Sequence, residues 1–146
     1  MAIRYFAIVA GIVYLLVGLL GFVPDLKTPP TTAPPLAVDT GYGFLLGLFP
    51  VNVLHNLVHV ALGIWGIAAF ATLGAARFYA RALAVIYAVL AVMGLIPGLD
   101  TTLGLIPIFG HDIWLHALTA LIAAYFGWVA EPSGRPAPAP SPRRLS

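Results

Sequence analysis

Four long stretches without a charged residue constrain this chain more than any other feature of its sequence. Asp, Glu, Lys and Arg are absent from residues 5–23, 40–76, 82–99 and 113–130. An α-helix rises about 1.5 Å per residue and the hydrocarbon core of a bilayer is about 30 Å thick, so roughly 20 residues cross it. A chain of 146 residues that is 61% hydrophobic and 8% charged cannot bury so much apolar surface in a soluble globule. The sequence therefore predicts an all-α integral membrane protein.

The lengths of these stretches predict the number of helices. We expect four transmembrane helices, near residues 4–23, 51–73, 76–96 and 111–130. A membrane β-barrel is excluded because its strands alternate between apolar and polar residues over about 10 positions, whereas these runs are continuous. The helices would form one transmembrane domain, residues 1–130, followed by a Pro- and Arg-rich tail, residues 131–146, that we expect to be disordered.

Two gap-free alignments of the chain with itself indicate an internal repeat. A shift of 73 positions places Arg4 on Arg77, Tyr14 on Tyr87 and Pro24 on Pro97, and a shift of 57 positions places Pro50 on Pro107 and His59 on His116. The two shifts differ by an insertion in the first hairpin loop, which is Pro-rich between residues 27 and 42 and is expected to be extended. The fold predicted is therefore two tandem helical hairpins of equal orientation, related by a pseudo-two-fold axis along the membrane normal.

The basic residues predict how the helices are oriented. One side of the predicted bundle carries Arg4, Arg77, Arg81, Arg135, Arg143 and Arg144, and the other carries only Lys27. Basic residues collect on the cytoplasmic side, so we expect a multi-pass protein of the plasma (inner) membrane with both termini in the cytoplasm. The net charge of +2 and the pI near 9.2 arise from these scattered residues. They form no basic stripe, so a nucleic-acid partner is excluded.

Small residues at helical spacing predict the faces on which the helices pack. Hydrophobic attraction between helices is weak inside a bilayer, so close approach depends on residues with little or no side chain. The predicted packing residues are Ala7, Gly11, Gly18, Gly63, Gly66, Ala80, Ala84, Ala91, Ala120 and Ala123.

Histidines on these packing faces are the candidate functional residues. His59 precedes Gly63 and Gly66 at i+4 and i+7, and His116 has Ala120 and Ala123 at the same spacing. Both histidines should therefore point into the bundle, where polar groups are costly and are suspected of function. His55 and Asp112 lie one turn further out, where helix capping or interfacial hydrogen bonding is the simpler interpretation.

The residues around these histidines also carry a resemblance. The stretch from Gly47 to His59, with the pattern GLFPVNxxHNxVH, and the DxWLH pattern from Asp112 to His116 resemble a family of small bacterial four-helix membrane proteins, the domain-of-unknown-function family 4383. The resemblance covers roughly residues 4–130 and implies a bacterial inner membrane and four helices. It implies no activity, substrate or catalytic residue.

Three classes of function remain open. The first is a non-catalytic membrane subunit or scaffold, bound to a membrane-protein partner or to further copies of itself within the lipid bilayer. The second is a haem, another tetrapyrrole or a metal site: His59 and His116 could ligate haem iron, or His55, His59, Asp112 and His116 could hold a divalent ion. The third is a small transporter or channel, although the broken helices of such proteins are absent.

Catalysis is not expected from this sequence. The chain has neither a phosphate-binding Gly-rich loop nor a Gly-x-Ser-x-Gly or His-Glu-x-x-His motif, and it contains no cysteine. Its serines are confined to Ser133, Ser141 and Ser146 in the tail, so a serine nucleophile inside the bundle is excluded.

Overall fold

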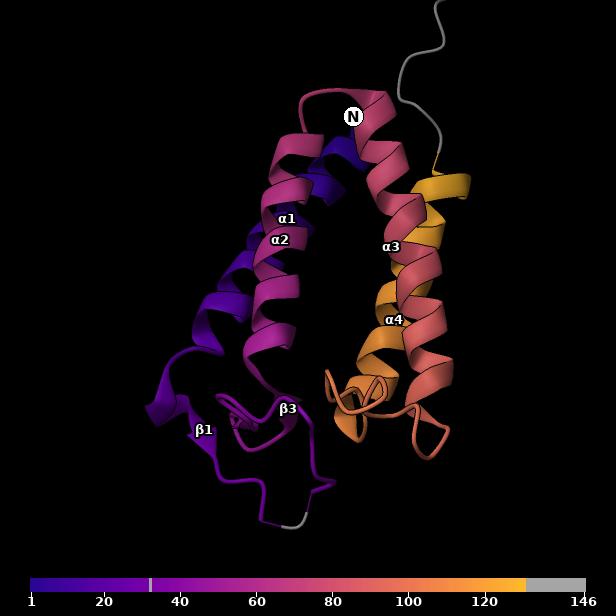
Figure 1. The fold of residues 1–146 in the computed structure, drawn as a ribbon. Helices are drawn as coiled ribbons and strands as arrows, with labels where there is room; N and C mark the ends of the chain where they lie inside the picture. The colour runs from indigo at the N-terminus through magenta and orange to yellow at the C-terminus, as the bar shows by residue number, and fades with distance from the viewer. Residues whose placement is uncertain (32, 131–146) are drawn as a thin grey trace, which may run out of the picture.

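The computed structural model describes residues 1–31 and 33–130, and this part of the chain is mostly helical (Figure 1). Its elements are α1 (Ala2–Leu20), the 3-10 turn η1 (Pro24–Leu26), β1 (Lys27–Thr28), β2 (Gly43–Leu45), β3 (Phe49–Val51), α2 (Val53–Ala69), α3 (Leu73–Gly94), α4 (His111–Ala124) and the π-helical segment η2 (Tyr125–Val129). The predicted tail, residues 131–146, lies outside the described residues.

Helix length and composition identify a membrane protein. Within the described chain, three helical stretches are long and apolar enough to cross a bilayer: Ala2–Leu20, Leu73–Gly94 and His111–Val129. Helix α2 is also apolar, but its 17 residues span only about 26 Å. Large apolar side chains cover the outer surface, and Val9 and Leu121 are 58% and 70% exposed. Such a surface is stable against lipid chains rather than water.

The helix ends differ by a few residues from those predicted. Helix α2 begins at Val53 instead of residue 51 because Val51 pairs with Gly43 in the sheet and Asn52 caps the helix, its Oδ1 accepting a hydrogen bond of 2.9 Å from the His55 amide. It ends at Ala69 instead of residue 73.

Helices α1, α3 and α4 also differ at their ends from the predicted helices. Helix α3 starts at Leu73, three residues before the predicted 76, because the Thr72 Oγ1 accepts a hydrogen bond of 3.1 Å from the Ala75 amide. Helices α1 and α3 end at Leu20 and Gly94 instead of residues 23 and 96. Helix α4 becomes π-helical at Tyr125, before the predicted end at residue 130.

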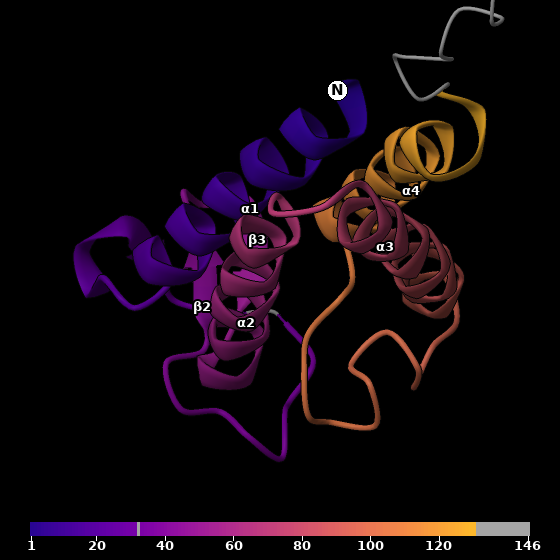
Figure 2. The ribbon, with the colours of Figure 1, turned by 90° about the horizontal axis from the view of Figure 1, so that it is seen from above.

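The helices pack as two hairpins, α1 with α2 and α3 with α4, and α1 also touches α3 (Figures 1 and 2). Glycines bring α1 and α2 into backbone contact. A Cβ at Gly11 would lie 2.6 Å from the Ile67 nitrogen, and a Cβ at Gly63 would lie 2.6 Å from the Leu15 nitrogen. No side chain fits at either position, as expected for helices that associate through small residues.

All ten small residues singled out in the sequence are buried. Four of those in α3 and α4 share one apolar core with Tyr79 and Leu83: Ala80, Ala84, Ala120 and Ala123. The core therefore runs along the faces where the helices meet, and many other large apolar side chains, such as Leu121, point outward.

A small antiparallel sheet, ordered β1-β2-β3, lies in the loop between α1 and α2. Of the segment 27–42 that was expected to be extended, only Lys27 and Thr28 belong to the sheet, where Lys27 pairs with Leu45. The other described residues of this segment form no helix or strand. The fully buried Asn52 joins the two hairpin loops, since its Nδ2 donates hydrogen bonds of 2.7 Å to the carbonyls of Val38 and Leu105. The sheet leads directly into α2 and thereby positions the first turn of that helix.

Candidate functional site

The first turns of α2 and α4 bring a cluster of polar side chains together inside the protein. His55 comes from α2, and Asp112 and His116 come from one face of α4 at i, i+4 spacing. Their exposures are only 5%, 3% and 4%. Buried polar groups are costly unless they are paired, so this cluster needs a physical explanation.

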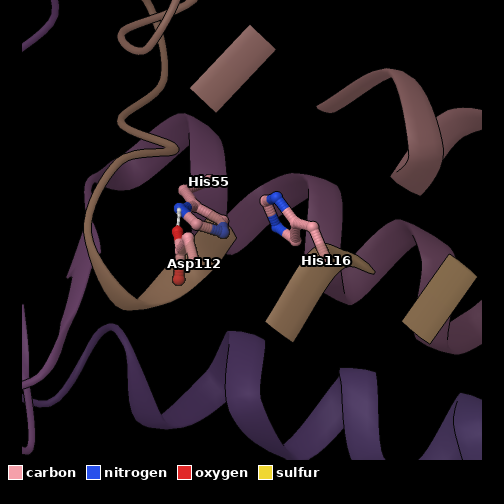
Figure 3. A group of neighbouring side chains, drawn as sticks. All are labelled: His55, Asp112 and His116. Atoms are coloured by element: carbon pink, nitrogen blue, oxygen red, sulfur yellow. Dashed lines mark ion pairs between the residues drawn. The ribbon is translucent and has the colours of Figure 1, made fainter. Parts of the chain in front are cut away.

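The three side chains are close enough to share one ligand. Each offers one ligand atom, and these atoms lie within 4.8 Å of one another. The His55 Nδ1 lies 3.9 Å from the Asp112 Oδ2. Figure 3 shows the His55 ring between the Asp112 carboxylate and the His116 ring. Two helices from different hairpins therefore contribute to one site.

A backbone carbonyl orients His55. Its Nδ1 lies 3.1 Å from the carbonyl oxygen of Pro50 in β3. A carbonyl oxygen only accepts hydrogen bonds, so Nδ1 donates the proton, and Nε2 of the neutral ring retains a lone pair. Metal-binding histidines are commonly fixed in this way by a hydrogen bond from their second nitrogen.

His59 lies beside the cluster and is half-buried. Its Nδ1 is 3.1 Å from the carbonyl oxygen of His55, one turn earlier in α2, and the two rings are 4.6 Å apart between centroids. His59 is not among the residues whose ligand atoms gather within 4.8 Å. Of the four residues considered for a metal site, the structure brings His55, Asp112 and His116 together and leaves His59 adjacent.

Two atoms of the cluster are buried without a hydrogen-bond partner. Among the described residues, neither the Asp112 Oδ2 nor the His116 Nδ1 has one. A buried polar atom left unpaired costs about 1–3 kcal/mol. The two atoms are therefore available to a ligand.

Two tyrosines connect the site to the rest of the bundle. The rings of Tyr14 and Tyr87 stack at 5.6 Å; Tyr14 lies 5.4 Å from the His59 ring, and Tyr87 lies 5.0 Å from the His116 ring. These tyrosines were matched by the repeat but were not considered as site residues, because an aromatic residue in an apolar run does not by itself indicate a site. The histidine pair considered for haem, His59 and His116, thus packs against two stacked tyrosines.

An apolar groove of about 730 Å³ runs along α1, between this helix and α4, and the cluster lines part of it. Valines and other apolar residues of α1 line one wall, and Leu115, Ile122 and Phe126 line the other. His55, His59, Asp112 and His116 also line it, whereas its lining contains no Lys or Arg. This groove was not predictable from helical spacing, since its two walls come from opposite ends of the chain.

Chemically, the cluster offers two imidazoles and one carboxylate. Imidazole nitrogens and carboxylate oxygens are the donors that bind Zn²⁺ and related divalent ions, and three protein ligands leave one coordination position open. The arrangement can therefore hold a metal ion whose fourth position faces the groove.

Comparison with known proteins identifies the family without assigning an activity. Residues 4–129 match the family described as Domain of unknown function (DUF4383). No curated protein and no solved structure matches the chain. Because the match covers nearly the whole described helical region, this chain belongs to the family described as Domain of unknown function (DUF4383).

Proposed function

We propose that this protein is a non-catalytic integral membrane protein that binds a divalent transition-metal ion, with Zn²⁺ as the best fit, through His55, Asp112 and His116. The observation that carries the proposal is that three buried ligand atoms from two hairpins lie within 4.8 Å of one another. A tetrahedral ion about 2.0–2.2 Å from each ligand atom needs only small side-chain movements from this arrangement.

The unpaired atoms support a metal over a simple hydrogen-bonded cluster. A cluster that served only to join the helices would pair its own donors and acceptors, yet the Asp112 Oδ2 and His116 Nδ1 lack partners among the described residues. A metal ion bound by these two atoms would give each of them a partner. It would also link α2 to α4 and thus join the two hairpins, which suits the scaffold function that the sequence suggested.

Several contacts support the proposed repeat. Arg4 Nε donates a hydrogen bond of 2.6 Å to the Phe70 carbonyl, and Arg81 Nε donates one of 2.9 Å to the Gly127 carbonyl. Phe70 and Gly127 are separated by the same 57 positions as His59 and His116. The Tyr14–His59 and Tyr87–His116 contacts correspond under the same two shifts. We therefore propose two tandem hairpins related by a pseudo-two-fold axis.

The proposed scaffold is a bacterial inner-membrane protein in which α2 also crosses the bilayer, since 17 residues are the lower limit for a span. The N-terminus and the end of η2 lie at the same end of the bundle (Figure 1). With Arg4, Arg77 and Arg81 at that end, both termini would be cytoplasmic. Its partner would be another membrane protein or a second copy, reached through the apolar outer surface.

The test is zinc binding by protein purified in mild detergent, measured by competition with a chromophoric chelator. We expect one Zn²⁺ per chain. His116→Ala and Asp112→Asn should each weaken binding by at least about tenfold. His111→Ala is the matched control, because His111 is an exposed histidine at the start of the same helix. Unchanged affinity in both cluster variants would refute the proposal.

A further inference from the structure

The groove between α1 and α4 is continuous with the polar cluster, and this continuity specifies a kind of ligand. The same cavity is lined by apolar residues along α1 and by His55, Asp112 and His116. A molecule that fills it must have an apolar body and a polar end. At about 730 Å³ the groove lies within the range of about 300–1,000 Å³ typical of small-molecule sites.

The length of the groove fits one hydrocarbon chain. It extends along α1 from Leu20 to Ala2, and Tyr14, which contacts the adjacent His59, lies between them. At about 1.5 Å per residue, the 12 steps from Tyr14 to Ala2 cover about 18 Å. One leaflet contributes half of the hydrocarbon core of about 30 Å, so a chain of one lipid is about 15 Å long. The groove therefore has room for one such chain, extended from the cluster along α1 toward Ala2.

The depth of the cluster agrees with this orientation. Asp112 is the second residue of α4 and His55 the third residue of α2, so both lie within one turn of the end of the apolar helices. Amphiphiles place their polar group at this boundary and their chain inside the core. The ligand thus has the orientation of an ordinary membrane lipid.

Space and charge define the polar end of the ligand. The three cluster side chains are at most 5% exposed, so a bulky phospholipid headgroup has no room beside them. A Zn²⁺ ion held by one carboxylate and two neutral imidazoles keeps one net positive charge and an open coordination position. The lining contains no Lys or Arg that could neutralise an anion in place of the ion. A compact anionic oxygen group on a single chain satisfies all three conditions.

We propose that the groove binds a long-chain fatty acid, with its hydrocarbon chain between α1 and α4 and its carboxylate in the open coordination position of the metal ion. This inference rests on the metal site proposed above. The ligand comes from the bilayer, since the groove lies between helices that face lipid.

The experiment uses the full chain in detergent and measures zinc affinity first, then the affinity for radiolabelled palmitate with and without zinc. We expect palmitate to bind the zinc-loaded protein at least about tenfold more tightly than the zinc-free protein, because the carboxylate then gains a metal ligand. Methyl palmitate, which has the chain but no carboxylate, should show no dependence on zinc. Equal palmitate affinity with and without zinc would overturn the inference.

Two tryptophan variants test the groove itself. Val13 lines the groove and is 51% exposed, whereas Ile12, its neighbour on α1, is 45% exposed and is not part of the lining. Val13→Trp should reduce palmitate affinity by about tenfold or more, because it displaces several methylene groups, and should leave zinc affinity unchanged. Ile12→Trp should change neither. If both variants bind palmitate as the native protein does, the groove is not the site.

The two proposals fail in distinguishable ways. Zinc binding that depends on Asp112 and His116, without zinc-dependent palmitate binding, would overturn the fatty-acid inference alone. Absence of zinc binding would overturn the proposed function and, with it, this inference.

Discussion

Replacing Gly63 by alanine tests the backbone contact between α1 and α2. A Cβ at residue 63 would lie 2.6 Å from the Leu15 nitrogen and 2.8 Å from its Cα. These are backbone atoms that no rotamer change can move, so the two helices must separate. Overpacking of this kind costs up to about 3 kcal/mol, whereas alanine offsets about 1 kcal/mol through its higher helix propensity. We expect Gly63→Ala to lower the free energy of unfolding by about 2 kcal/mol.

The matched control is Gly74→Ala, because a Cβ at this helical position meets nothing within 4 Å. Without a clash, only the difference in helix propensity between alanine and glycine remains. The free energy of unfolding of this variant should therefore rise by up to about 1 kcal/mol. Thermal unfolding in detergent would measure both, and the Gly63 variant should lose about 4–8 °C at about 2–4 °C per kcal/mol. A Gly63→Ala protein as stable as the native one would refute the close packing described above.

Three further outcomes are expected. Asn52→Asp keeps the cap on α2 but loses the two hydrogen bonds from Nδ2 to Val38 and Leu105, so it should destabilise the protein by about 2–3 kcal/mol, measured by the same thermal unfolding. A destabilisation below about 0.5 kcal/mol, the usual effect of a surface substitution, would contradict this. Zinc at 100 times its Kd should stabilise the native protein by about 2.7 kcal/mol and the His116→Ala variant by much less. Equal stabilisation of the two proteins would count against the site. A periplasm-only reporter enzyme fused at residue 35 should be active and one fused at residue 75 inactive; activity at 75 would reverse the proposed orientation.

The membrane class and the family were predictable from the sequence because both depend on local features. A run of uncharged residues either reaches about 30 Å or does not, whatever the rest of the chain does. The patterns from Gly47 to His59 and from Asp112 to His116 were enough to identify the family, and the match over residues 4–129 confirms it. Helix ends were less predictable, because the starts of α2 and α3 depend on single side-chain caps at Asn52 and Thr72.

The site was predictable only as a set of candidates. Helical spacing puts His55 and His59 on one face of α2, and Asp112 and His116 on one face of α4. It does not say which turn of α2 lies level with His116, because that depends on the relative axial shift and crossing of two helices from different hairpins. Nor does the spacing show that the Pro50 carbonyl is available to orient His55, since the strand β3 supplies it.

The sequence by itself determined that the chain is a helical membrane protein and which small and polar residues share each helix face, because the length of apolar runs and the period of a helix are properties of neighbouring residues. Only the tertiary structure decided that His55, rather than His59, joins Asp112 and His116, and that α1 and α4 enclose an apolar groove lined in part by these side chains. Both features arise where helices distant in the chain meet, and the packing of the two hairpins sets that arrangement.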